Sequence, residues 1–283
     1  LSDCGGEIVD IGNAVTKWKI GEQVMSSCFP NWLDGQPSPE LLSFIGDHQD
    51  GYACEYIAIA ETALTVTPKG WSALQAATLP CAGLTVWRAL IDEGNLQPGE
   101  SVLVQGTGGV SIFALQLAKA MGATVIAAAS SEDKLDFACD AGADMRINYT
   151  TENLKDQVKK LTNGKGADVV YDPVGGDFSE QAFRAIAWNG RFLVIGFASG
   201  PIPKMPLNLA LLKGASMVGV FWGAWSHRDP MASKTNFDEL IEMIDSGAFS
   251  LLVSQVYALA DFDEAFASIA ERRAKGKVIL SMV

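Results

Sequence analysis

One stretch decides the fold of this chain: Ser101-Val102-Leu103-Val104-Gln105-Gly106-Thr107-Gly108-Gly109-Val110-Ser111. Residues 101–105 are a short apolar run typical of a buried strand, and a helical pattern follows over 112–121. The glycines at 106 and 108 permit a sharp turn and a close approach of a ligand to the backbone, while the helix start presents N–H groups to negative charge. Ser111 holds a third position that must be small, because a larger side chain would push the helix off the strand. We therefore expect a strand–turn–helix unit that binds phosphate.

Strand and helix patterns alternate after this unit. The expected strands lie at 101–105, 124–128, 145–148, 168–171, 191–195 and 216–220. The expected helices lie near 110–121, 132–141, 152–162, 178–187 and 207–213, and the C-terminal part adds helices at 237–246 and 263–274 and strands at 253–259 and 278–282. Such alternation predicts an α/β fold, a doubly wound parallel sheet of the Rossmann type. Within that context the turn predicts a dinucleotide site that includes Gly106, Gly108, Gly109 and Val110.

The residues before this sheet indicate a different domain. Residues 7–12 and 21–25 alternate apolar with polar side chains, as strands of a small β domain do, and the Pro-rich residues 26–50 indicate a long loop that forms a lobe or lid. The pattern opens in mid-domain, so we expect an N-terminally truncated β domain. The predicted division is 1–83 for this domain, 84–223 for the dinucleotide-binding domain and 224–283 for a C-terminal segment.

Composition excludes several classes of partner. The chain has 283 residues with 21 Lys and Arg against 33 Asp and Glu, and its formal charge of −12 repels nucleic-acid phosphates and anionic membranes. No apolar run reaches the roughly 20 residues that a membrane-spanning helix needs, and no signal-peptide pattern is present. The five cysteines are scattered without a Cys-x-x-Cys pair, which argues against a disulfide framework and a zinc ribbon. We expect a cytoplasmic protein that acts on a small molecule.

The end of the second strand bears on which dinucleotide is bound. Residues 127–131 contain no Asp or Glu to accept the ribose 2′-hydroxyl of NAD. Instead Ser130, Lys134 and Tyr149 could surround a 2′-phosphate, with Lys134 supplying the positive charge. This favours NADPH over NADH. The alternative is that Lys134 is an ordinary solvated helix residue.

Two further turns follow strands directly, at 172–176 and 196–200. Ligands of open α/β sheets bind at the carboxyl ends of the strands, so we assign cofactor contacts to Val174 and Phe197. The alternative is that both are ordinary strand–helix turns, for which Gly and Pro suffice.

These motifs together resemble a known family. The residues that carry the resemblance are Ala76-Ala77-Thr78-Leu79-Pro80, the Gly106 loop, Ile147-Asn148-Tyr149, and the segments 170–176, 190–200 and 276–278. On them the chain resembles the medium-chain dehydrogenases/reductases, and within these the zinc-independent NADPH:quinone oxidoreductases, the family that includes zeta-crystallin. The resemblance implies a partial GroES-like catalytic domain to which the C-terminal segment returns, a substrate cleft beside the Rossmann domain, a cofactor contact at Lys277, and a homodimer.

Residues 1–84 and the Gly106 loop are more similar to zinc-type alcohol dehydrogenase relatives, so the metal must be considered separately. Cys81 matches the third catalytic zinc ligand of those enzymes, but Ser2-Asp3 stands where they carry a His-Glu pair. Catalytic zinc needs three protein ligands and structural zinc four, whereas residues 26–54 supply only Cys28 and Cys54. We predict a metal-free protein in which Cys81 is a small core residue, Thr85 contacts the nicotinamide, and the two histidines, His48 and His227, lie on the surface.

Without zinc, no Lewis acid polarises an isolated carbonyl. Quinones and enones accept hydride conjugately and spread the charge to a distant oxygen, so positioning beside the nicotinamide supplies much of the catalysis. We expect an NADPH-dependent reductase of quinones or α,β-unsaturated carbonyls with no assigned catalytic residue. Four aromatic side chains could line the substrate slot or pack in the core: Phe29, Trp32, Phe221 and Trp222. The alternatives are a zinc-lacking alcohol dehydrogenase-like enzyme or enoyl-thioester reductase, and a non-catalytic dinucleotide-binding protein or truncated remnant.

Overall fold

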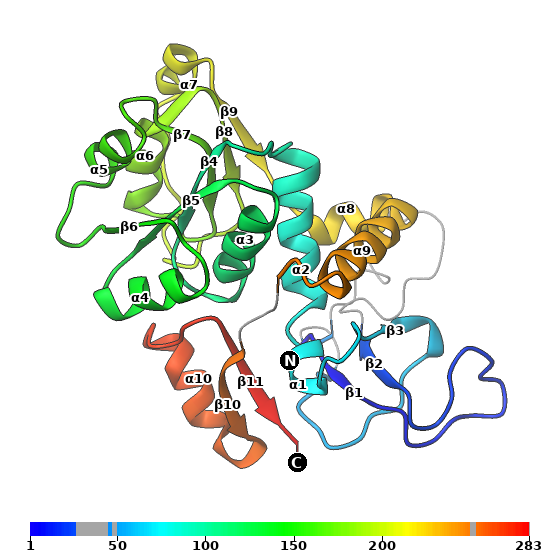
Figure 1. Cartoon of the computed structure of the whole chain (residues 1–283). Coiled ribbons are helices and arrows are strands. Elements are labelled where there is room, and N and C mark those ends of the chain that lie inside the picture. Colours follow the sequence, from blue (N-terminus) through cyan, green and yellow to red (C-terminus); the bar gives the residue numbers. More distant parts are fainter. Residues whose placement is uncertain (27–44, 47–49, 250–252, 283) are drawn as a thin grey trace. The chain divides into compact units, whose positions relative to one another are not determined.

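The computed structural model describes residues 1–26, 45–46, 50–249 and 253–282. The chain divides into two compact units (Figure 1). The first consists of Leu1–Leu84 together with Gly223–Val283, and the second is Thr85–Trp222. Each unit is described by itself.

The second unit is built on a six-stranded sheet in which every neighbouring pair is parallel. The strand order is β6-β5-β4-β7-β8-β9, and the strands are β4 (Ser101–Gln105), β5 (Thr124–Ala129), β6 (Met145–Asn148), β7 (Ala167–Asp172), β8 (Ile186–Val194) and β9 (Ser216–Gly219). The order reverses beside β4, which lies between β5 and β7. The predicted α/β fold with a doubly wound parallel sheet is confirmed, and the reversal is where open sheets of this type bind ligands.

Helices connect these strands and cover the sheet (Figure 1). They are α3 (Gly109–Ala120), α4 (Glu132–Asp140), α5 (Leu154–Leu161), α6 (Asp177–Arg184) and α7 (Asn208–Lys213). Leu103 of β4 and Val170 of β7 are fully buried in one core cluster with residues of α5 and α6. Helix α3 packs against β4 and β5. Continuous apolar strands are expected in a parallel sheet because both of its faces are buried.

The first unit contains two small sheets. The antiparallel sheet consists of β1 (Gly5–Glu7), β2 (Gln23–Ser26) and β3 (Leu64–Val66), and the parallel pair consists of β10 (Val253–Ala258) and β11 (Lys277–Ser281). Its helices are α1 (Ala73–Ala76), α8 (Trp222–Arg228), α9 (Pro230–Asp245) and α10 (Phe262–Ala270). Ile8, Trp18 and Val24 form a small core. Within the described part of the chain, no helix combines the length and apolar character needed to cross a lipid bilayer.

One helix has an unusual ending. Helix α2 (Pro80–Trp87) continues into a π-helical segment, Arg88–Glu93. The sequence pattern predicted only a helical region over 71–96, because hydrophobic spacing does not distinguish α from π turns. The short 3₁₀ turns Glu61–Ala63 and Leu259–Asp261 complete the described elements.

A buried carboxylate joins two strands at the amino edge of the large sheet. Asp168 of β7 is 8% exposed and accepts hydrogen bonds from the Ser101 backbone N–H and hydroxyl, both at 2.9 Å, and from Lys165 Nζ at 2.8 Å. Burial raises the pKa of the Asp168 carboxyl, but the hydrogen bonds from Lys165 and Ser101 outweigh this effect and the pKa lies below its ordinary value. The ionised carboxylate therefore stabilises the fold.

We predict that Asp168→Asn lowers the free energy of unfolding by about 1–2 kcal/mol at pH 7, because a buried hydrogen-bonded charge is lost. A carboxyl whose pKa is lower in the folded than in the unfolded chain stabilises the fold above the unfolded pKa and loses that effect as the pH falls. The difference from the wild type, measured by urea unfolding, should shrink below about pH 4. Asp140→Asn, at an exposed position ending α4, is the matched control. A difference independent of pH would contradict the prediction.

Candidate functional site

The turn after β4 has the shape that a bound phosphate group requires. Gly106 has φ +77° and donates its backbone N–H to the Ala128 carbonyl at 2.8 Å. A Cβ atom at Gly106 would lie 3.2 Å from Val174 Cγ2, whereas one at Gly108, the N-cap of α3, would meet nothing within 4 Å. At Gly106 the turn therefore leaves little room for a side chain beside Val174, whereas the backbone at Gly108 has free space for a ligand. These residues fit a dinucleotide diphosphate placed at the start of α3.

Ser111 anchors the turn. It is 2% exposed, and its hydroxyl donates to the Gln105 carbonyl at 2.8 Å. The first turn of α3 is therefore bonded to the last residue of β4. The sequence analysis predicted only that residue 111 must be small. The structure shows that its hydroxyl also forms a hydrogen bond to the strand.

The turns that follow β7 and β8 are packed against each other. The Ser199 backbone N–H donates to the Val174 carbonyl at 2.8 Å. Gly175 has φ +71°, and a Cβ there would lie 2.9 Å from Phe197 Cδ1. The structure thus brings Val174 and Phe197, two predicted cofactor contacts, into one assembly at the carboxyl edge.

Asp172 organises the first of these turns. Its Oδ1 accepts the backbone N–H groups of Val174 and Gly175, each at 2.9 Å, and its Oδ2 accepts the Ser179 hydroxyl at 2.5 Å. Burial raises the pKa of this carboxyl, which is 3% exposed, and the three hydrogen bonds offset only part of that effect. Asp172 is engaged in holding the turn, which is a structural role.

Of the residues predicted to surround a 2′-phosphate, Ser130 follows β5, Tyr149 follows β6, and Lys134 lies in the first turn of α4. Lys134 Nζ donates to Ser130 Oγ at 3.5 Å, and the Tyr149 backbone N–H donates to the Ala129 carbonyl at 3.2 Å. The Tyr149 ring packs on Phe178 with 4.2 Å between ring centroids. Sequence reasoning missed Phe178, and its position in the first turn of α6, two residues after Gly176, was the available signal.

Glu132 is a second residue beside this set that the sequence analysis did not identify. It lies in the first turn of α4, just beyond the residues searched for a ribose-binding acid. Its Oε1 accepts Asn148 Nδ2 at 2.7 Å, and its Oε2 lies 3.5 Å from an Arg146 nitrogen. The carboxylate is therefore already engaged by an amide and a guanidinium.

The other two predicted cofactor contacts occupy different units. Thr85 is half-buried in α2 at the start of the second unit, whereas Lys277 belongs to the first unit and lies 3.4 Å from Asp3 Oδ2. Asp3 Oδ1 also accepts the Cys81 backbone N–H at 3.1 Å. Lys277 thus bonds within its own unit, joining β11 to the N-terminal residues.

The metal candidates form no cluster in the part of the chain that the structure describes. Among those residues, no group of three or more His, Cys, Asp or Glu side chains is placed to hold a metal ion. Partial burial raises the pKa of the Cys4 thiol, because removal from water disfavours the thiolate. Four of the candidates named from sequence lie outside the described residues: Cys28, Phe29, Trp32 and His48. The side chain of His227 is also outside the described part of the structure. Of the other aromatic candidates, Trp222 is 7% exposed and Phe221 is 77% exposed.

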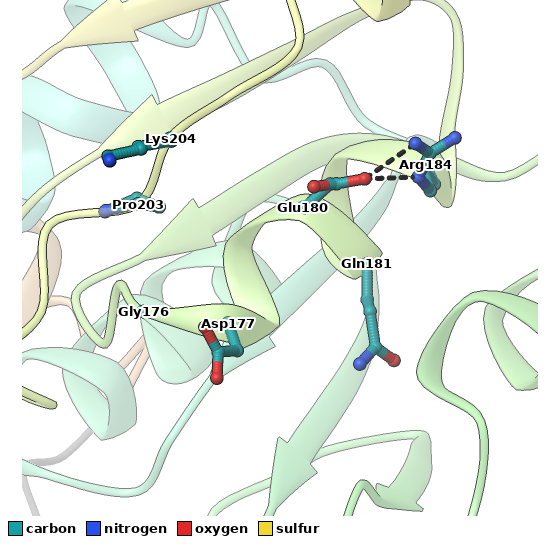
Figure 2. A pocket seen from close by; sticks show the side chains of 7 residues that line it. All are labelled: Gly176, Asp177, Glu180, Gln181, Arg184, Pro203 and Lys204. Atoms are coloured by element: carbon teal, nitrogen blue, oxygen red, sulfur yellow. Dashed lines mark hydrogen bonds and ion pairs between the residues drawn. The ribbon is translucent and has the colours of Figure 1, made fainter.

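A surface pocket of about 320 Å³ lies beside α6 (Figure 2). It is lined by Gly176, Asp177, Glu180, Gln181, Arg184, Pro203 and Lys204. Glu180 and Arg184 form an ion pair at 2.6 Å, and the lining carries two acids and two bases. None of the predicted cofactor residues lines it, and its mixed charge does not select an anionic ligand.

Comparisons with known proteins agree with this geometry. Residues 109–246 match the family described as zinc-binding dehydrogenase, a range that does not include Cys81. The chain is similar to a quinone oxidoreductase-like protein 2 homolog of Nematostella vectensis, with 35% identity over 99% of this chain and 72% of that protein. Its structure is similar to that of a putative alcohol dehydrogenase from Sinorhizobium meliloti 1021, with a TM-score of 0.87, 35% identity, and coverage of 99% of this chain and 81% of that one. It is also similar to Escherichia coli quinone oxidoreductase complexed with NADPH, with a TM-score of 0.79, 26% identity, and coverage of 99% and 81%.

Proposed function

Because this chain belongs to the quinone oxidoreductase family of the medium-chain dehydrogenases/reductases, we propose that it binds NADPH and reduces quinones or α,β-unsaturated carbonyls without a metal. The observation that carries the proposal is the turn at Gly106, closed toward Val174 and open at Gly108. NADPH bound there supplies the hydride. The backbone N–H groups at the start of α3 hold the diphosphate, and the turns at Val174 and Phe197 border the cofactor.

Cofactor preference is assigned to the ends of β5 and β6. Ser130, Lys134 and Tyr149 would hold the 2′-phosphate, with Lys134 supplying the charge. The Escherichia coli neighbour was solved with NADPH, which supports this choice. The Arg146 guanidinium, 3.5 Å from the Glu132 carboxylate, offsets the negative charge beside this set.

The substrate follows from what the remaining residues can do. A substrate that accepts hydride conjugately fits a site to which we assign no catalytic acid or base. In a quinone or enone the developing charge moves to a conjugated oxygen, which one hydrogen bond or water can stabilise. Thr85 and Lys277 are the further residues expected to contact the cofactor.

A second candidate is an alcohol dehydrogenase-like or enoyl-thioester reductase activity, supported by the similarity to the Sinorhizobium protein. A spectrophotometric assay separates the two. NADPH oxidation with 1,2-naphthoquinone but not with a simple aldehyde is the expected result. The reverse pattern would favour the second candidate, and binding of NADPH without turnover of either substrate would favour a non-catalytic dinucleotide-binding protein.

We predict that Lys134→Ala weakens NADPH binding about tenfold or more, because a charge-assisted hydrogen bond to phosphate is lost. NADH, which lacks the 2′-phosphate, should bind the variant as well as it binds the wild type. Both dissociation constants can be measured by fluorescence titration. Lys155→Ala, at an exposed position on α5, is the matched control and should change neither. Equal weakening of both cofactors by Lys134→Ala would refute the assignment.

The homodimer implied by the resemblance is also proposed, through the edge of the large sheet. Strand β9 pairs with β8 alone among the described strands. Large apolar side chains are exposed in β8, in and directly before α7, and in and shortly after β9: Trp188 (70%), Leu207 (81%), Leu211 (80%), Met217 (40%) and Phe221 (77%). An uncovered edge strand beside exposed apolar groups favours pairing with a second copy.

Met217→Lys places a charge on this edge and should shift the protein to monomer in sedimentation velocity runs. Met231→Lys, at an exposed site of α9 in the other unit, is the matched control and should leave the oligomeric state unchanged. A wild type that is already monomeric at micromolar concentration would disprove the dimer.

A further inference from the structure

One buried amide in the second unit is unsatisfied. The Gln105 side chain, at the end of β4, is 1% exposed. Neither its amide nitrogen nor its amide oxygen has a hydrogen-bond partner among the residues that the structure describes. Buried polar side chains nearly always have partners, and leaving one without them destabilises a fold. Gln105 at this position therefore calls for an explanation beyond packing.

The sheet register places this amide at the ligand-binding edge. Gln105 pairs with Ala128 of β5, and the pairing of Val104 with Tyr171 puts Asp172 of β7 beside it on the other flank. Side chains alternate along a strand, so Gln105 shares the sheet face of Leu103. Gln105 is the last residue of β4 and is followed directly by Gly106, so it stands where the turn that would carry the diphosphate begins.

The nearest polar neighbour in the sheet does not satisfy the amide. Both oxygens of Asp172 accept other groups, Oδ1 from Val174 and Gly175 and Oδ2 from Ser179. The backbone carbonyl of Gln105 is also engaged, by Ser111. Because ligands of open sheets bind at this edge, the missing partner is expected from a ligand.

We propose that Gln105 is a positioning residue of the dinucleotide site, whose amide completes its hydrogen bonds only when the cofactor is bound, directly or through a water that the cofactor orders. This inference rests on the proposed function. In the free protein the buried amide costs stability, and in the complex it contributes to binding. Gln105 thus lowers the stability of the cofactor-free chain and raises its affinity for the cofactor.

Gln105→Met tests this, because methionine has a similar length but no hydrogen-bonding group. We expect the melting temperature of the cofactor-free protein to stay equal or rise, while the dissociation constant for NADPH, measured by titration calorimetry, rises about tenfold. Gln105→Glu keeps the shape and places a negative charge beside Asp172 and the diphosphate. It should weaken NADPH binding further than Gln105→Met does.

Gln116→Met is the matched control, since Gln116 is 8% exposed and lies on α3 seven residues beyond its start at Gly109. It should leave the NADPH dissociation constant unchanged. A lower melting temperature of cofactor-free Gln105→Met, or an unchanged dissociation constant, would overturn the inference, because either result gives Gln105 a purely structural role. If the wild type binds neither NADPH nor NADH, the proposed function fails instead.

Discussion

The carboxyl edge of the large sheet depends on how the chain is held as it leaves β4. The Gly106 N–H bonds to Ala128 and joins the turn to β5, and the Ser111 hydroxyl bonds to Gln105 and joins α3 to β4. Together these bonds fix the start of α3 over the point where the strand order reverses. In this medium-chain oxidoreductase, Gly106 and Ser111 therefore act mainly by fixing the backbone of the turn.

The parallel sheet could be predicted because strands buried on both faces are continuously apolar in sequence, and helical patterns separate them. The expected strand 145–148 coincides with β6. Strand β8 begins at Ile186, before the expected 191, because its early part contains exposed Trp188 and a left-handed Asn189, which carry no strand signal. Helix α9 begins at Pro230, where the Asp229 carboxylate accepts the Ala232 N–H, and that cap starts the helix earlier than the apolar spacing indicated.

The candidate site was predictable where a backbone requirement dictates the residue, as at Gly106 and Ser111. It was not predictable where a role depends on a partner distant in sequence. Phe178 matters because it packs on Tyr149, and Glu132 because Asn148 and Arg146 engage it. Gln105 was predicted as one more residue of a buried strand, and only its lack of a partner among the described residues distinguishes it. Residue type and spacing do not contain such information.

The contact between Gly175 and Phe197 has a consequence for how enzymes of this kind diverge. A side chain at Gly175 would collide with Phe197, so neither turn can change its backbone unless the other changes with it. The ends of β5 and β6 are linked to each other through Ser130 and Thr150, and Tyr149 packs on Phe178 of α6. The turns after β7 and β8 must therefore evolve in concert, and at the other end the coupling runs through side chains, from Lys134 to Ser130 and from Glu132 to Asn148. A designer who changes one member of such a contact has to change its partner as well.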